Sequence, residues 1–130
     1  MAPEFSPRRE KTVCNRPGAA EPAVLDLDHL ARYTVGNREL EEELLRLFRA
    51  QMRTQVTAIA GAGDAEAWRF ATHTLKGVAR SLGAGVIAET AAALETLGHG
   101  AEGDRSAALL MALHAQVEAC EREIDRLIGR

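Results

Sequence analysis

Residues 71–84 read ATHTLKGVARSLGA, and this stretch decides how the rest of the chain is interpreted. Its composition is that of a helix, yet Gly77 stands in the middle, where glycine costs about 1 kcal/mol relative to alanine. On a helical wheel of about 100° per residue, His73 lies opposite an apolar side and Gly77 lies one turn further along on the polar side. The apolar side consists of Ala71, Leu75, Val78 and Leu82.

The missing side chain at Gly77 is expected to expose His73 to an approaching protein. A side chain four residues along a helix covers its neighbour, so glycine there leaves the imidazole open. Lys76 and Arg80 lie on the same side, and cations disfavour the imidazolium form, which keeps a ring nitrogen available as a nucleophile. The same cations could hold the oxygens of a phosphoryl group on that nitrogen. Arg69 and Phe70 complete the expected contact surface.

The expected site contains a nucleophile and cations and nothing further. We predict no second carboxylate, no glycine-rich phosphate loop and no metal cluster beside His73, and a ring that no neighbouring side chain holds. Such a site could accept and pass on a phosphoryl group, but it could not bind ATP. The other histidines are scattered and are interpreted as surface or loop residues: His29, His99 and His114.

Helical signals follow one another outside this stretch, and no alternating strand pattern competes with them. Residues 1–23 contain all four prolines, three of them within residues 1–18, and are expected to be a disordered tail, leaving residues 24–130 as one domain. A short helix capped by Asp26 or Asp28 comes first, and a helix over 38–60 follows Asn37. Its apolar stripe is expected at Leu40, Leu44, Leu47, Met52 and Ile59, widened by Leu45, Phe48 and Val56.

Three further helices are predicted, the first over 65–82 with Asp64 as N-cap and Gly83 at its end. The others span about 86–97, before Gly98, and about 105–127, before Gly129. Short loops between long amphipathic helices favour antiparallel packing. We therefore predict an all-α fold, an antiparallel four-helix bundle with an additional short N-terminal helix.

Composition excludes several classes of function. Hydrophobic residues make up 46% of the 130 residues, and the net charge of -3 argues against nucleic-acid binding. No apolar run approaches the roughly 18 residues of a membrane span, and no apolar segment follows Arg8, Arg9 and Lys11 as in a signal peptide. Cys14 and Cys120 lie in different contexts, which favours reduced thiols. We expect a cytoplasmic protein that binds neither membrane nor nucleic acid.

The segment HTLKGVARSLGA resembles the signature of histidine-containing phosphotransfer (HPt) domains, commonly written H-x-L-K-G-S-x-x-x-L-G. The order of the helical segments over about residues 24–128 is similar to that of the family as well. The resemblance implies that His73 is phosphorylated on Nε2, that Lys76 lies near the phosphate and that Gly77 lets a receiver domain approach. Val78 departs from the frequent serine, and the wheel turns it toward the core. The role expected for Arg80 comes from helix geometry alone and is not part of the family signature.

The same resemblance implies a phosphorelay intermediate rather than an enzyme with its own ATP site. Its expected partners are response-regulator receiver domains and a hybrid histidine kinase. The chain itself is expected to need no cofactor, since Mg²⁺ belongs to the receiver, and to act as a monomer. The chain ends just after its last helix, which favours a free-standing carrier over a module excised from a larger hybrid or chemotaxis-type kinase.

Three other classes of protein share some of these features. The dimerising domain of a histidine kinase usually has an acidic residue directly after its histidine, whereas Thr74 follows here. A di-metal four-helix bundle requires Glu-x-x-His pairs, and the sequence has none. An inert helical interaction module remains open, and replacing His73 by glutamine distinguishes it from a phosphocarrier.

Overall fold

The structure, a computed structural model, describes residues 25–101 and 104–129, so the expected tail at 1–23 lies outside it. Within those two ranges the chain forms five helices and no strand. They are α1 (Leu27–Thr34), α2 (Arg38–Ala60), α3 (Ala65–Leu82), α4 (Gly85–Leu97) and α5 (Arg105–Ile128). The expected helices are all present, with α4 starting one residue earlier and α5 ending one residue later than predicted.

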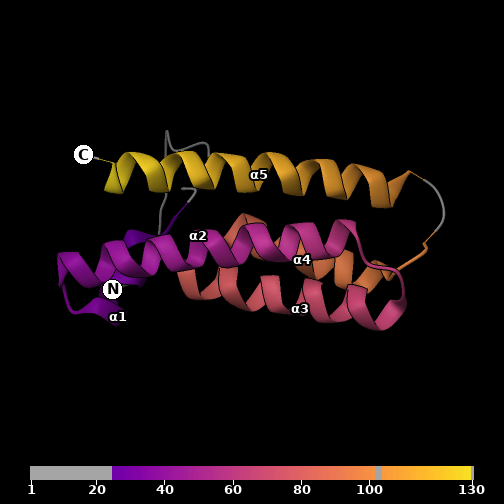
Figure 1. The fold of residues 1–130 in the computed structure, drawn as a ribbon, viewed down its shortest axis with the longest axis horizontal. Coiled ribbons are helices and arrows are strands. Elements are labelled where there is room, and N and C mark those ends of the chain that lie inside the picture. The colour runs from indigo at the N-terminus through magenta and orange to yellow at the C-terminus, as the bar shows by residue number, and fades with distance from the viewer. Residues whose placement is uncertain (1–24, 102–103, 130) are drawn as a thin grey trace, which may run out of the picture.

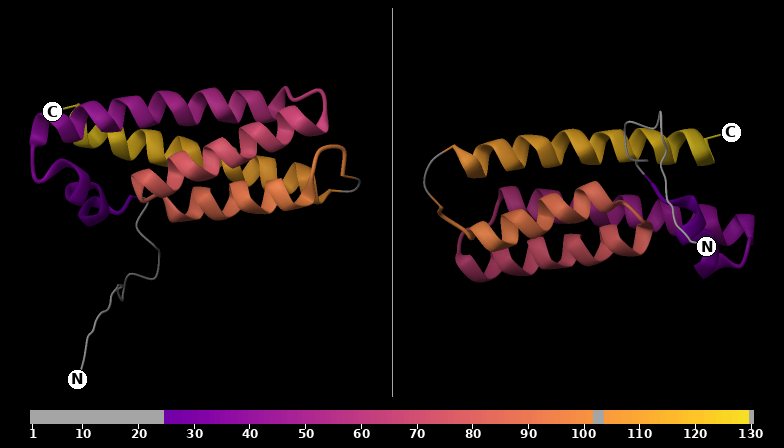
Figure 2. Two further views of the ribbon diagram at one scale, coloured as in Figure 1. Left: turned by 90° about the horizontal axis from the view of Figure 1, so that it is seen from below. Right: turned by 180° about the vertical axis from the view of Figure 1, so that it is seen from behind.

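The four long helices form an antiparallel bundle, which confirms the predicted fold (Figure 1). Each long helix packs against two others, because α2 contacts α3 and α5, and α4 contacts α3 and α5. Helix α1 lies at one end of the bundle, where it contacts α2 and α3 (Figure 2). None of the described helices is both long and apolar enough to cross a membrane.

The starts of the first three helices are fixed by side-chain caps. Asp26 accepts a hydrogen bond from the His29 backbone at 3.0 Å, Asn37 from Leu40 at 3.0 Å and Asp64 from Ala67 at 2.8 Å. Each cap satisfies one backbone N–H that has no partner within its own helix. All three capping residues were predicted from the sequence, with Asp26 and not Asp28 in the first position.

The core is aliphatic, as the composition indicates, but α2 turns a different side toward it than predicted. Leu40 and Leu47 are 43% and 54% exposed, so their assignment to the buried stripe was wrong. They are seven residues apart and so mimic helical periodicity, yet they lie on the side of α2 that faces away from its two neighbours. The side of α2 that packs between α3 and α5 buries Leu45, Met52, Val56 and Ile59.

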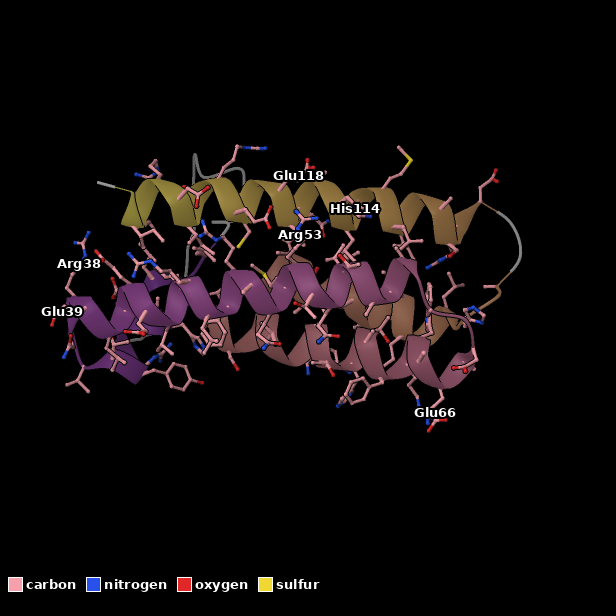
Figure 3. The ribbon with its side chains drawn as sticks, in the orientation of Figure 1. Arg38, Glu39, Arg53, Glu66, His114 and Glu118 are labelled. Atoms are coloured by element: carbon pink, nitrogen blue, oxygen red, sulfur yellow. The ribbon has the colours of Figure 1, made fainter. Side chains whose placement is uncertain are left out.

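Ion pairs join α2 to α5 along the flank of the bundle. The Arg53 guanidinium donates to both carboxylate oxygens of Glu121, at 2.6 Å and 3.1 Å, and one turn away Arg49 pairs with Asp125. Arg53 projects from α2 into the space between the two helices (Figure 3). These pairs show that the side of α2 with Arg49 and Arg53 faces α5. The opposite side of α2 is therefore turned away from α5.

Candidate functional site

Helix α3 presents His73 on the side opposite the core. Its buried side chains include Ala71, Leu75 and Leu82, as the wheel predicts, together with Ala79, and Val78 is partly buried against the same core. The His73 side chain is 69% exposed. The prediction that this imidazole points outward is confirmed. The exposed face of α3 therefore offers a histidine ring to solvent and to any partner.

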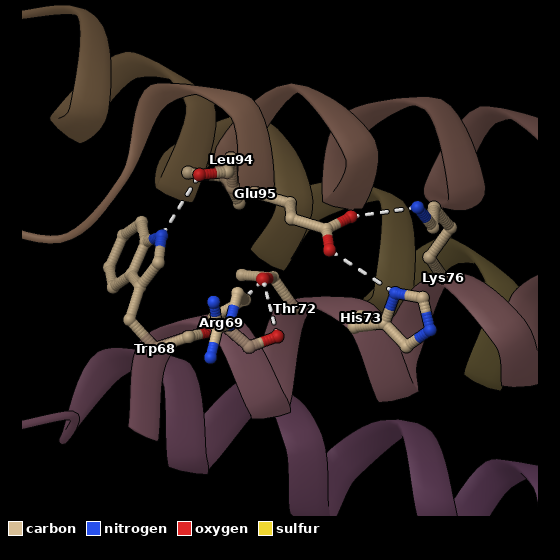
Figure 4. A network of polar contacts seen from close by, with 7 residues as sticks. All are labelled: Trp68, Arg69, Thr72, His73, Lys76, Leu94 and Glu95. Carbon is tan, nitrogen blue, oxygen red and sulfur yellow. Dashed lines mark hydrogen bonds and ion pairs between the residues drawn. The ribbon is translucent and has the colours of Figure 1, made fainter. Parts of the chain in front are cut away.

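One carboxylate links His73 to Lys76. Glu95, on α4, places Oε2 at 3.2 Å from Nδ1 of His73 and Oε1 at 2.7 Å from Nζ of Lys76 (Figure 4). The Lys76 and Glu95 side chains are 17% and 22% exposed, so both are far less solvated than the imidazole. Nε2 makes no hydrogen bond to any residue that the structure describes. The ring therefore has one held nitrogen and one open nitrogen.

Glu95 corrects two predictions made from the sequence. A carboxylate, that of Glu95, does lie beside His73, and it holds the imidazole at Nδ1. Both predictions considered α3 alone, whereas Glu95 comes from the next helix of the bundle. Its carboxylate also neutralises the Lys76 ammonium, so the cation cannot act on the imidazole as an isolated charge.

The position of Glu95 follows from the short turn between α3 and α4. His73 and Glu95 each lie about eleven residues from the turn at Gly83, so antiparallel packing places them at the same level. The register is fixed further along the pair, where the Trp68 indole donates to the Leu94 carbonyl oxygen at 2.9 Å. The turn length was thus a usable signal for Glu95 in the sequence.

The environment of Glu95 favours its ionised form. The hydrogen bond from Lys76 lowers the pKa of the Glu95 carboxyl, and the contact with His73 contributes in the same direction, against the opposing effect of partial burial. An ionised carboxylate can only accept hydrogen bonds. Glu95 is therefore an acceptor toward both of its partners at neutral pH.

The surface on the α2 side of His73 is open and partly apolar. A Cβ added at Gly77 would meet no atom within 4 Å, and Phe70 is 69% exposed. Leu47 and Gly77 each lie about fifteen residues from the α2–α3 turn, which places the exposed Leu47 level with Gly77. Leu47 also lies about 160° around α2 from Arg49, away from α5. The fold does not itself require glycine at 77.

Two predicted arginines lie on the exposed surface but make no contact with the imidazole. Arg69 lies on the α4 side of α3, where it lines a surface depression with Glu95 and His99. Phe70 is also exposed and lies about 100° further around the helix, which turns it away from α4. Arg80 is exposed and forms no ion pair with any described residue. The structure thus brings together His73, Lys76 and Glu95, and leaves Arg69, Phe70, Gly77 and Arg80 around them.

The described part of the chain contains no set of side chains suited to binding a metal ion. No group of three or more His, Cys, Asp or Glu side chains there could hold a metal ion. The thiol of Cys120 is buried between helices, and burial raises its pKa to about 12. The chemistry on the exposed face therefore rests on the open nitrogen of His73 and the groups around it.

Fold and site together define a helical bundle that displays one accessible imidazole beside a lysine–glutamate pair. The family model described as Hpt domain matches residues 43–128. The chain belongs to the Hpt domain family, and it is a histidine phosphotransfer protein of phosphorelay signalling. Hpt domains are phosphocarriers that interact with receiver domains and histidine kinases. The resemblance read from residues 73–84 is confirmed.

A solved structure shows the same fold. It is the crystal structure of histidine-containing phosphotransfer protein B (HptB) from Pseudomonas aeruginosa PAO1, with a TM-score of 0.70 and 23% sequence identity. The similarity covers 82% of this chain and 95% of that one. A comparison with curated protein sequences found no significant match.

Proposed function

We propose that His73 is the phospho-acceptor and that it exchanges a phosphoryl group with aspartates of receiver domains. The observation that carries this proposal is the open Nε2 on an imidazole that is 69% exposed, while its other nitrogen is held by Glu95. The open nitrogen attacks the phosphorus of an aspartyl phosphate in line. An N–P bond forms, the aspartyl O–P bond breaks, and its electron pair returns to the aspartate carboxylate.

The receiver domain docks across α2 and α3. Phe70, about two turns before Gly77 on α3, and Leu47, on α2, supply exposed apolar area. The bare helix turn at Gly77 lets the partner backbone approach His73. Large exposed apolar side chains in one region of a surface are typical of protein interaction sites. Arg69, on the other flank of His73, can pair with acidic groups at the rim of the receiver.

Charge stabilisation in this mechanism is shared between the two proteins. Mg²⁺ bound to the receiver would neutralise phosphoryl oxygens during transfer, and this chain would need no cofactor of its own. Lys76 and Arg80 are the cations of α3 that lie beyond phospho-His73, three and seven residues further along the helix. Arg80 lies two turns from His73, about 10 Å along the axis, within reach of the docked phosphoryl region for an arginine side chain. Lys76 reaches the phosphoryl group only by leaving Glu95.

The carrier acts as a cytoplasmic monomer. Its partners, receiver domains and a hybrid histidine kinase, exchange phosphoryl groups with it one encounter at a time. A single exposed imidazole serves both directions of transfer, because the same in-line geometry runs backward toward the next receiver.

The test is phosphate transfer from a phosphorylated receiver domain to the purified chain. We expect acid-labile phosphate on the unmodified chain and none on His73→Gln, while His114→Gln serves as a matched control that keeps full incorporation. Incorporation into His73→Gln at the level of the unmodified chain would show that His73 is not the acceptor. Absence of incorporation into either chain, from any of a panel of receivers, would favour an inert helical module.

A further inference from the structure

The outer side of α2 carries exposed leucines and carboxylates side by side. Leu40 and Leu47 are 43% and 54% exposed, and the exposed Glu43 lies one turn from each of them. Glu39 is also exposed and lies one turn before Glu43. We call these four residues the α2 row. They lie on the side of the helix that faces away from its packing partners, so none of them contributes to the buried core.

The negative charge of the α2 row has no partner in the described part of the chain. The arginines on this part of α2, Arg38 and Arg46, pair with Glu42 at 3.0 Å and 3.9 Å. Glu39 and Glu43 form no ion pair with any described residue. The helix dipole favours a carboxylate in the first turn, which accounts for Glu39 but not for Glu43 in the second turn. The row therefore suits a segment that carries both cations and apolar side chains.

The chain enters the described structure at the level of this row. The Asp26 backbone N–H donates to the Gly83 carbonyl oxygen at 3.1 Å, which holds the start of α1 at the end of α3. Gly83 and Glu43 each lie about twenty residues from the α2–α3 turn, so antiparallel packing places them at the same level. Among the described helices, α1 contacts only α2 and α3 (Figure 2). The segment before Leu25 is therefore tethered on the α2–α3 side of the bundle.

We propose that residues 5–13, FSPRREKTV, dock on the α2 row of their own chain and compete there with the receiver domain. The cations of this segment meet the two carboxylates of the row, and its apolar side chains meet the two leucines. These cations and apolar residues are Arg8, Arg9, Lys11, Phe5 and Val13. The proposal rests on the proposed function, because Leu47 belongs to the surface on which the receiver docks. It gives the carrier a segment of its own that limits access to this surface.

The connection is long enough for this contact and keeps the segment close to the row. Lys11 lies fourteen residues before Leu25, and an extended chain of that length spans about 45 Å, whereas the row is about 10 Å long. A tether of this kind gives a local concentration in the millimolar range. Exposed ion pairs are individually weak and are screened by salt. The segment therefore covers the row part of the time, and a docking receiver displaces it.

Paramagnetic relaxation measures the contact without any phosphate. Cys14 directly follows the segment, whereas Cys120 is fully buried and its pKa is raised to about 12. A thiol-reactive nitroxide therefore labels Cys14 in the folded full-length chain. We expect broadening of the amide signals of the α2 row and none at the exposed Met111 on α5. The broadening should disappear at about 1 M salt, where the Debye length is about 3 Å.

Two sets of substitutions separate a specific contact from mere proximity. Arg8→Gln, Arg9→Gln and Lys11→Gln together remove the cations of the segment. Glu39→Gln and Glu43→Gln together remove the carboxylates of the row, and each set should abolish most of the broadening. The matched control exchanges the cations for each other, as Arg8→Lys, Arg9→Lys and Lys11→Arg, and should keep the broadening.

Three results of the relaxation experiment would overturn the proposal. The first is broadening of the row that survives both glutamine sets, and the second is broadening that is equally strong on α5. The third is broadening that is equally strong between chains, measured by mixing nitroxide-labelled ¹⁴N protein with unlabelled ¹⁵N protein.

Phosphate transfer measures the competition. At a receiver concentration below KM, the chain with three glutamines in residues 8–11 should accept phosphate about two- to fivefold faster than the unmodified chain, the scale of one or two exposed ion pairs. At saturating receiver the two rates should be equal, and the exchange control should match the unmodified chain throughout. Unchanged transfer in the glutamine variant would show that the segment does not compete with the receiver, which would also overturn the proposal.

The two readouts separate this proposal from the proposed function. If the row broadens as expected but His73→Gln still accepts phosphate, the docked segment is confirmed and His73 is not the acceptor. If His73→Gln is inactive but the row shows no specific broadening, His73 is the acceptor and the docked segment is wrong.

Discussion

Gly77 is the residue at which stability and the proposed function make opposite demands. Glycine weakens a helix, and in the free protein nothing within 4 Å would obstruct a side chain at this position. The fold therefore gains nothing from glycine here. The proposed docking of a receiver gives a reason for it, because a side chain at 77 would stand between the partner and His73.

We predict that Gly77→Gln slows phosphotransfer about tenfold or more and leaves the free energy of unfolding equal or higher, by up to about 1 kcal/mol. Stopped-flow transfer from a phosphorylated receiver and urea unfolding measure the two effects. Ala67→Gln, exposed near the start of the same helix, is the control and should transfer at the normal rate. A Gly77→Gln protein with an unchanged rate would count against the access argument.

For single residues, the sequence predicts the features that depend on one helix alone. The outward direction of His73 and the open position at Gly77 both follow from the period of α3. Glu95 does not follow from that period, because its contact with His73 depends on the register between α3 and α4. The ion-pair partner of Lys76 was missed for the same reason, because its ammonium pairs with a carboxylate on a neighbouring helix.

Among the elements, α1 is attached to the bundle at the end of α3. Gly83 has a φ of 82°, and its carbonyl oxygen accepts a hydrogen bond from the Asp26 backbone at 3.1 Å. A Cβ at this position would lie 2.7 Å from the Cβ of Asp26. Gly83 thus ends α3 in a conformation suited to glycine and lets the start of α1 pack closely against it.

Gly83→Ala is expected to lower the free energy of unfolding by about 1–2 kcal/mol, from the left-handed backbone alone, and by more if α1 is displaced. Gly85→Ala is the control two residues along, where nothing lies within 4 Å and φ is not positive, and it should be at least as stable as the unmodified chain. Urea unfolding followed by Trp68 fluorescence compares the two. Equal stability of Gly83→Ala and the unmodified chain would refute the close contact.

Helix boundaries were the most predictable part of the fold. Asp26, Asn37 and Asp64 mark helix starts through local hydrogen bonds, which depend only on nearby sequence. The side of α2 that faces the core was less predictable. Leu40 and Leu47 have the spacing of a buried stripe, but they are exposed. The positions of α3 and α5 determine which side of α2 is buried, and these positions cannot be predicted from the periodicity of α2.

Over the whole molecule, the core is continuous enough to shield a thiol from reaction. Cys120 is fully buried on α5, and its pKa is raised to about 12 by burial, so almost no thiolate exists at pH 8 in the folded state. The thiolate is the reactive form of cysteine. Alkylation of Cys120 should therefore require opening of the bundle.

In a Cys14→Ser chain, we predict that Cys120 is alkylated at pH 8 at least 100-fold more slowly in the native state than in urea. The dependence of the rate on urea concentration should follow the unfolding curve. Mass spectrometry of quenched samples gives the labelled fraction. Rapid labelling without denaturant would show that α5 separates readily from α2 and α4.

The central claim is that this bundle exists to present Nε2 of His73, and it can be measured directly. After incubation of ¹⁵N-labelled protein with a phosphorylated receiver domain, ³¹P and ¹⁵N NMR at alkaline pH locate the phosphoryl group. We predict a ³¹P–¹⁵N coupling to Nε2 of His73 that is absent from His73→Gln. A phosphoryl group on Nδ1 of His73, or on His29, His99 or His114, would contradict the account.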